Sequence, residues 1–127
     1  MKRRAIGFFL SVLLMLPAVV GAVSEKEFEV RTTRDLINIC SAAPDDPLHT
    51  QAVNFCEGYL VGAFHYYQAS TVGPKASKLI CLPDPQPSRN DTVKMFIEWA
   101  KAHPQYEKDL PVETEFRFLI EKWPCKP

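Results

Sequence analysis

The chain has 127 residues, enough for one domain with a modest core, and its 15 basic and 15 acidic side chains balance at neutral pH. Three basic residues lie at positions 2–4, in a segment that we expect to be removed, which leaves 12 basic against 15 acidic residues and a charge of −3. No basic stripe remains in that mature chain, so its charge argues against nucleic acid as a partner.

The first 22 residues have the layout of a secretory signal peptide. After the basic start comes an apolar run over residues 5–20, and then Ala22, a small residue suited to a cleavage point. Retention as a membrane anchor is the less favoured alternative, because the run is short for a span of ~20 residues. We therefore expect cleavage after Ala22, a periplasmic location without stable membrane insertion, and one mature domain over residues 23–127.

Residues 23–31 are charged, and we expect them to be frayed or partly ordered. Thr32 and Asp35 then have the spacing of a capping box, which predicts a first helix over about residues 33–42. Asp46 is placed to cap a second helix of about twenty residues, with Pro47 at its first position.

The second helix carries its apolar residues at helical spacing, on one face. They are Val53, Cys56, Leu60, Ala63, Phe64 and Tyr67. Gly58 and Gly62 lie in the same helix, where each glycine costs about 1 kcal/mol relative to alanine. We expect this pair to form a packing surface that another helix approaches closely.

A long irregular connection follows over residues 70–90, with Gly73 and four prolines. Ser88 to Asp91 can cap a third helix, which His103 and Pro104 should end. Its predicted core face consists of Val93, Phe96, Ile97 and Ala100.

Asp109 can cap a fourth helix that has Pro111 in its first turn and ends at Pro124. Its predicted apolar face consists of Val112, Phe116, Leu119, Ile120 and Trp123. No stretch alternates convincingly at the two-residue period of a strand. The predicted fold class is therefore all-α, a small four-helix domain stabilised by disulfides after a cleaved signal peptide.

All four cysteines, Cys40, Cys56, Cys81 and Cys125, lie in the mature part, and an even count in a small exported chain predicts two disulfides. Of the three connectivities we favour Cys40–Cys56 with Cys81–Cys125, because each pair flanks one helical hairpin. A metal site and a catalytic thiol are the less favoured alternatives, since no Cys-x-x-Cys spacing occurs.

Several landmarks along residues 32–125 together resemble a known family. They are "LINIC" in the first helix, "CEGYLVGAF" in the second, "CLP" at 81–83, a helix ending in "HP" at 103–104, and "WPC" at 123–125. In order and spacing they look like the Rap/Tai family of periplasmic immunity proteins.

This resemblance implies a small disulfide-bonded helical domain that is often a homodimer. It also implies the function: binding and blocking a cell-wall amidase toxin that a type VI secretion system injects. Such a toxin cuts peptidoglycan peptide bonds with a cysteine nucleophile, and the immunity protein covers that cleft without catalytic residues of its own.

The sequence offers no set of residues for catalysis, so we predict no enzymatic activity and no cofactor. The histidines lack metal-ligand spacing: His49, His65 and His103. For His65 we favour an ordinary hydrogen bond to a carbonyl or water at a helix end. A binding or pH-sensing role is the alternative. The acidic residues of the fourth helix are expected to form a solvated face: Glu113, Glu115 and Glu121.

The predicted partner-binding site lies in the proline-rich segment from Thr71 to Arg89 and in the tyrosines before it. Prolines lower the entropy lost on ordering, and tyrosine often anchors a partner. The predicted contact residues are Tyr66, Tyr67, Lys75, Lys78 and Arg89. The alternatives are that this segment only packs over its own core, and that the protein is a periplasmic chaperone or stress-related binding module without a toxin partner.

Overall fold

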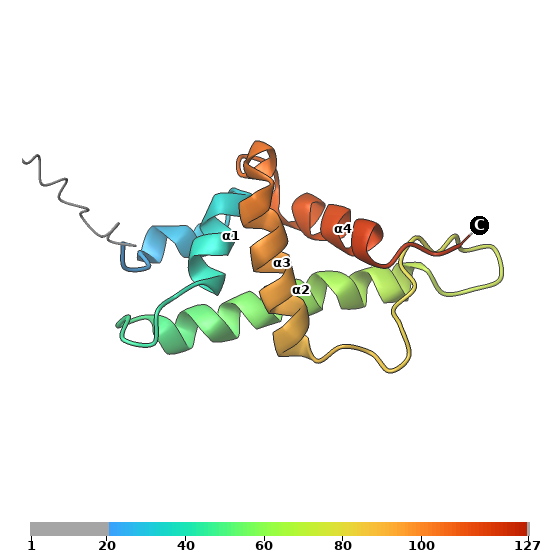
Figure 1. The fold of residues 1–127 in the computed structure, drawn as a ribbon, viewed down its shortest axis with the longest axis horizontal. Coiled ribbons are helices and arrows are strands. Elements are labelled where there is room, and N and C mark those ends of the chain that lie inside the picture. Colours follow the sequence, from blue (N-terminus) through green and yellow to red (C-terminus); the bar gives the residue numbers. More distant parts are fainter. Residues whose placement is uncertain (1–20, 127) are drawn as a thin grey trace, which may run out of the picture.

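The computed structural model describes residues 21–126 and shows a helical domain (Figure 1). Its elements are η1 (Glu25–Glu29), α1 (Thr33–Cys40), α2 (His49–Ser70), α3 (Arg89–Ala102), η2 (Pro104–Tyr106) and α4 (Pro111–Lys122), η denoting a 3-10 helix. Among these residues the one contact of strand type is an antiparallel bridge between Ile80 and Pro124. The predicted all-α fold with four helices is confirmed, whereas the predicted signal peptide falls mostly on residues 1–20, outside the described residues.

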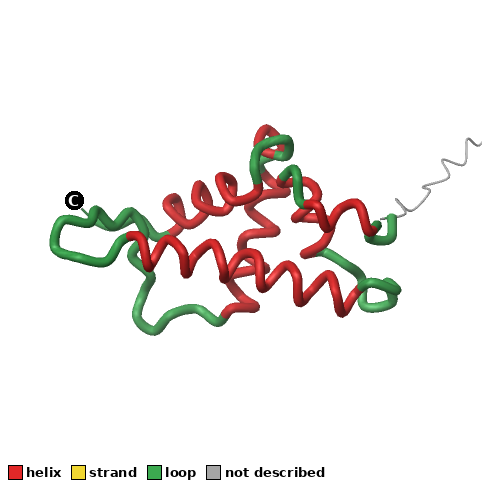
Figure 2. The backbone as a smooth tube through the Cα atoms, turned by 180° about the vertical axis from the view of Figure 1, so that it is seen from behind, coloured by secondary structure: helices red, strands yellow, loops and turns green. Residues whose placement is uncertain are grey.

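Helix α2 is the longest element and runs along the length of the molecule (Figure 1). Helix α3 crosses α2, while α1 lies against its N-terminal half and α4 against its C-terminal half. The chain between α2 and α3 extends past the end of α2, and the C-terminus lies beside it in both views (Figure 2). Helix α2 thus contacts the other three helices, and α1 likewise contacts α2, α3 and α4.

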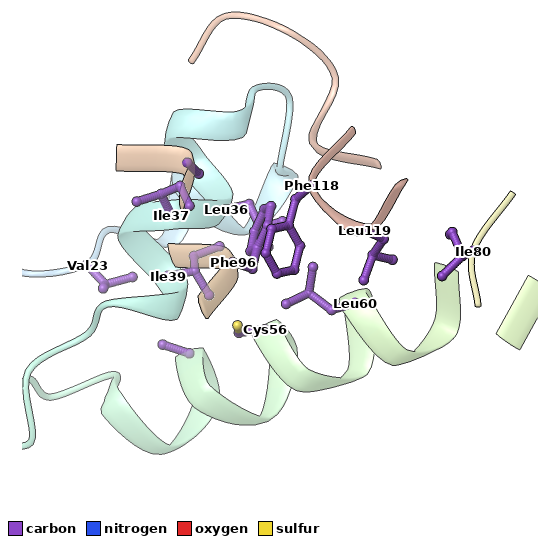
Figure 3. Packing of buried hydrophobic residues seen from close by; sticks show 12 residues of the cluster. Val23, Leu36, Ile37, Ile39, Cys56, Leu60, Ile80, Phe96, Phe118 and Leu119 are labelled. Atoms are coloured by element: carbon purple, nitrogen blue, oxygen red, sulfur yellow. The ribbon is translucent and has the colours of Figure 1, made fainter. Parts of the chain in front are cut away.

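Side chains from all four α-helices meet in one core (Figure 3). The rings of Phe96 and Phe118 lie with their centroids 5.8 Å apart at its centre. Leu36 from α1, Leu60 from α2 and Leu119 from α4 pack around them. The faces predicted for α2 and α3 are confirmed in outline, because the predicted residues of both helices are buried or half-buried there.

The face predicted for α4 is partly wrong. Val112 is 38% exposed, whereas Thr114 is fully buried and Glu115 is only 3% exposed. Thr114 can face the core because its hydroxyl lies 2.7 Å from the hydroxyl of Thr33 on α1, so both buried groups are hydrogen-bonded. Helix α4 is therefore rotated so that two polar residues lie inside.

Most predicted helix ends are confirmed. Thr32 and Asp35 form the capping box at the start of α1. The side chain of Ser88 accepts a hydrogen bond from the backbone N–H of Asp91 at the start of α3. Helices α3 and α4 end shortly before the prolines that were expected to stop them.

The expected caps of the other two helices are wrong. Helix α2 begins at His49, and Pro47 lies in the turn before it. The carboxylate of Asp46 instead accepts hydrogen bonds from two backbone N–H groups, that of Leu48 at 2.8 Å and that of Val23 at 2.7 Å. Asp109 does not cap α4; its backbone carbonyl accepts a hydrogen bond from the N–H of Thr33, 2.9 Å away.

The segment expected to be frayed or partly ordered, residues 23–31, is ordered. Val23 is 8% exposed and belongs to the core, held by its bond to Asp46. Ser24 and Glu27 form a capping box at the start of η1. This short charged sequence is therefore ordered by a local capping box together with a contact to a distant residue, Asp46, which local patterns do not show.

The expectation that Gly58 and Gly62 pack against another helix is also wrong. Both residues are exposed, and a Cβ atom built on either would meet nothing within 4 Å. No other helix of the described chain approaches this face of α2. The two glycines therefore do not explain how α2 packs in the structure.

Both favoured disulfides are present. Cys40–Cys56 joins the end of α1 to α2 in the core, with Cys56 only 1% exposed. Cys81–Cys125 joins the chain between α2 and α3 to the C-terminal residues. No free cysteine remains among residues 21–126.

Candidate partner-binding surface

The connecting segment, defined here as residues 71–88, forms the projecting end of the molecule (Figures 1 and 2). It is tied to the C-terminal residues by the Cys81–Cys125 disulfide. Two backbone hydrogen bonds lie beside that bond, from the N–H of Cys81 to the carbonyl of Trp123 at 2.9 Å and from the N–H of Cys125 to the carbonyl of Leu79 at 3.1 Å. The segment is therefore an exposed loop whose base is held by a disulfide and two backbone hydrogen bonds.

Tyr67 attaches the connecting segment to α2. Its hydroxyl oxygen accepts hydrogen bonds from the backbone N–H groups of Leu79 at 2.8 Å and Ile80 at 3.0 Å. Its half-buried ring lies against Phe64 and Phe116, with centroids 6.0 and 5.4 Å away. Tyr67 thus contacts its own chain, which is the alternative to partner binding that the sequence left open.

Replacing Tyr67 with phenylalanine should loosen the connecting segment, because two backbone N–H groups lose their acceptor. Each lost hydrogen bond should cost roughly 0.5–1.5 kcal/mol. Amide hydrogen exchange at Leu79 and Ile80 should become faster, while the core stays protected. Tyr66→Phe is the matched control, and equal protection of the two amides in Tyr67→Phe would contradict this role.

Tyr66 faces solvent and is 77% exposed, so the structure separates the two neighbouring tyrosines. Two apolar residues of the connecting segment are exposed as well, Val72 at 75% and Leu79 at 53%. Sequence reasoning missed both, although an apolar residue in a polar, proline-rich loop is a recognisable signal. Together they place apolar side chains at the projecting end of the chain.

The basic residues predicted to bind a partner are all exposed. Lys75 and Lys78 lie on the connecting segment itself. Arg89 is the first residue of α3 and forms an ion pair with Glu57 of α2, with 3.7 Å between the charged atoms. Four of the five predicted contact residues are thus available to a partner, and Tyr67 is the exception.

A cavity of about 290 Å³ lies between α2, α3 and α4, next to the connecting segment. Glu115 lines it and is almost fully buried, which corrects the expectation of a solvated acidic face on α4. Its Oε2 atom has no hydrogen-bond partner. Burial raises the pKa of the Glu115 carboxyl to about 8, so the group is mostly protonated at neutral pH.

The other two acidic residues of α4 do lie at the surface. Glu113 pairs with Arg117 one turn later, and Glu121 accepts a hydrogen bond from the indole N–H of Trp99 at 3.1 Å. These contacts hold charged groups in water, where they contribute little to stability. The expectation of a solvated acidic face therefore holds for two of the three glutamates.

Two of the three histidines, His49 and His103, make ordinary contacts at helix borders. Nδ1 of His49 lies 3.1 Å from the carbonyl of Ala42, and Nδ1 of His103 lies 2.7 Å from the carbonyl of Trp99. His65 is exposed at the edge of the cavity. Between residues 21 and 126 no group of three or more His, Cys, Asp or Glu side chains is placed to hold a metal ion.

Within the same described range, no helix is both long and apolar enough to cross a membrane. What the described residues do show is a small helical domain closed by two disulfides, with an exposed connecting segment. This is the architecture of a small disulfide-stabilised domain of the kind found in exported proteins.

The family model of Rap1a immunity proteins matches residues 32–125, which is most of the chain, and the protein belongs to this family. The match begins at the capping residue of α1 and ends at the last disulfide cysteine. It confirms the family resemblance drawn from the sequence. No curated protein and no solved structure matched the chain in the corresponding comparisons.

Proposed function

We propose that this protein binds and inhibits a peptidoglycan amidase toxin delivered by a type VI secretion system, and that it does so in the periplasm. The observation that carries the proposal is membership of the Rap1a immunity proteins over residues 32–125. The two disulfides support an oxidising compartment, because such bonds persist outside the cytosol. In this role the protein needs no catalytic residues of its own and acts by blocking the active-site cleft of the toxin.

The connecting segment is the best candidate for the surface that meets the toxin. Blocking an enzyme cleft takes a protruding element on a rigid base, and this segment is held at its base by a disulfide and by Tyr67. Exposed apolar residues can anchor the contact, while Lys75 and Lys78 can meet an acidic rim. Whether the protein acts as a homodimer stays a prediction.

The test is inhibition of a purified peptidoglycan amidase toxin, sought first among the products of neighbouring genes. The purified protein should abolish cleavage of cell-wall peptides at a near-stoichiometric ratio. Tyr66→Ala, Leu79→Ala and Lys78→Glu should each weaken the complex by about 1–3 kcal/mol, the usual range for an interface anchor, without changing the melting temperature.

Leu110→Ala is the matched control, because Leu110 is 61% exposed but lies at the start of α4, outside the connecting segment. Equal affinity for all three variants and the wild type would move the interface to another face. Absence of inhibition, together with suppression of aggregation of unrelated unfolded proteins, would favour the chaperone alternative.

A further inference from the structure

The cavity beside the connecting segment has room for one small ligand or one inserted side chain. Its volume of about 290 Å³ is close to the lower limit of ligand pockets, which span roughly 300–1,000 Å³. Its walls are mostly apolar and include Leu60, Phe64, Val93 and Phe96. An occupant must therefore be small and largely aliphatic.

Glu115 is the most buried polar group in this cavity, with 3% of its surface exposed and Oε2 without a partner. The basic side chains nearest the cavity give Oε2 no hydrogen bond. Arg89 lines the edge, is more than half exposed and pairs with Glu57, while His65 lies at the surface. From α2, Tyr59 faces Glu115 as a neutral phenol whose pKa is raised by burial and by that carboxyl.

The remaining polar side chains around the cavity supply further acceptors. They are Gln68 on α2, Gln86 in the connecting segment and Thr92 on α3. A primary ammonium has three N–H donors, so a carboxylate together with amide and hydroxyl oxygens suits it. Apolar walls, a deep carboxyl and a few outer acceptors match a chain of methylenes that ends in an ammonium.

We propose that this cavity binds an aliphatic chain ending in a primary ammonium group, with the Glu115 carboxylate as its acceptor. The chemistry is that of a lysine side chain of another protein or of a free alkylamine. A buried charge is costly alone, and pairing with an ammonium compensates both groups. An aliphatic chain ending in an anion would be repelled by the ionised Glu115 carboxylate. A purely apolar chain would leave Oε2 of Glu115 without a hydrogen-bond partner. The inference does not depend on the toxin.

Binding should depend on pH in a defined direction. An alkylammonium stays charged up to a pH of about 10. Because burial raises the pKa of Glu115 to about 8, binding at neutral pH must release the proton of this carboxyl. The affinity should thus rise roughly tenfold per pH unit from pH 6 towards 8 and level off above.

The experiment is a titration of ¹⁵N-labelled protein with n-pentylamine, followed by NMR at pH 6, 7, 8 and 9. We expect shifts at the amides of Val61 and Val93, which line the cavity, and tighter binding at higher pH. 1-Pentanol is the neutral match and should bind at least tenfold more weakly at pH 9. Nα-acetyl-lysine N-methylamide distinguishes the sources: binding of it indicates a lysine side chain, and binding of pentylamine alone indicates a free amine.

Glu115→Gln should lose the preference for pentylamine over pentanol, while Glu113→Gln, an exposed change two residues away on α4, should keep it. Val93→Phe fills the cavity but retains the carboxyl of Glu115, and it should also lose pentylamine binding. This variant tests the proposal if Glu115→Gln does not fold. Equal binding of amine and alcohol, no binding of amine at pH 9, or unchanged binding by Glu115→Gln would overturn the proposal.

Discussion

Replacing Glu115 with glutamine is expected to remove most of the loss of stability that the wild-type protein shows as the pH rises from 5 to 8. Glu115 is 3% exposed, and burial raises the pKa of its carboxyl from 4.5 to about 8. The folded state therefore holds a proton that the unfolded chain releases already near pH 4.5. Its contribution to stability is fully present below that pH and is lost as the pH rises through 8.

The expected size follows from the width of this pH window. A difference of one pKa unit corresponds to about 1.4 kcal/mol, so the loss is on the order of 5 kcal/mol over the whole window. Glutamine cannot ionise, and the free energy of unfolding of the variant should change much less with pH. The buried amide costs some stability at low pH, so the curves should cross, with the variant the more stable protein at pH 9.

The measurement is urea unfolding of both proteins between pH 5 and 9. Glu113→Gln serves as control, because Glu113 is exposed and should leave the wild-type slope unchanged. Groups such as Asp46, whose pKa is lowered by hydrogen bonds from backbone N–H groups, act in the opposite direction and are common to all three proteins. Parallel curves for wild type and Glu115→Gln would show that Glu115 is not a buried acid.

Removing the Cys81–Cys125 disulfide should be the second large effect. The chain-entropy relation gives about 4 kcal/mol for Cys81–Cys125, with a sequence separation of 44, and about 3 kcal/mol for Cys40–Cys56, with a sequence separation of 16. Cys81 is exposed, so the double change of Cys81 and Cys125 to serine should act through loop entropy and leave the core intact. Helical circular dichroism should persist, while the melting temperature falls strongly.

The two disulfides should also differ in how readily they are reduced. Cys56 is 1% exposed, whereas Cys81 lies at the surface, so mild reductant should open the Cys81–Cys125 bond first. Peptide mapping after brief reduction and alkylation would show the order. Two or more free thiols in protein that is unfolded but not reduced would contradict the pairing itself.

The helices could be predicted because their signals are local. The capping box of Thr32, the prolines after α3 and α4, and the apolar spacing in α2 each act within a few residues of the element that they define. The favoured disulfide pairing followed from which helices the cysteines flank. The helix signals need no knowledge of packing, and the pairing needs only that the flanked helices form hairpins.

The errors arose where distant residues decide the structure. The hydroxyl of Thr33 on α1 forms a hydrogen bond with that of Thr114, so Thr114 can face the core. The same orientation of α4 buries its neighbour Glu115. For Tyr67 the sequence left partner binding and packing over the connecting segment open, and the hydrogen bonds that its hydroxyl accepts come from backbone groups 12 and 13 residues further along. Periodicity treats charged and hydroxyl residues as external and therefore cannot show such pairs.

The bond between Val23 and Asp46 bears on maturation. The backbone nitrogen of Val23 lies 2.7 Å from Oδ2 of Asp46, and its side chain is in the core. Cleavage after Ala22, as predicted from the sequence, would turn that amide into an α-ammonium, and the hydrogen bond into an ion pair between the new chain end and the turn before α2. Removal of the signal peptide would thereby strengthen the contact that holds Val23, the first residue of the mature protein. Recombinant protein that keeps extra residues before Val23 would lack this pair, so comparisons of stability should use a chain that starts at Val23.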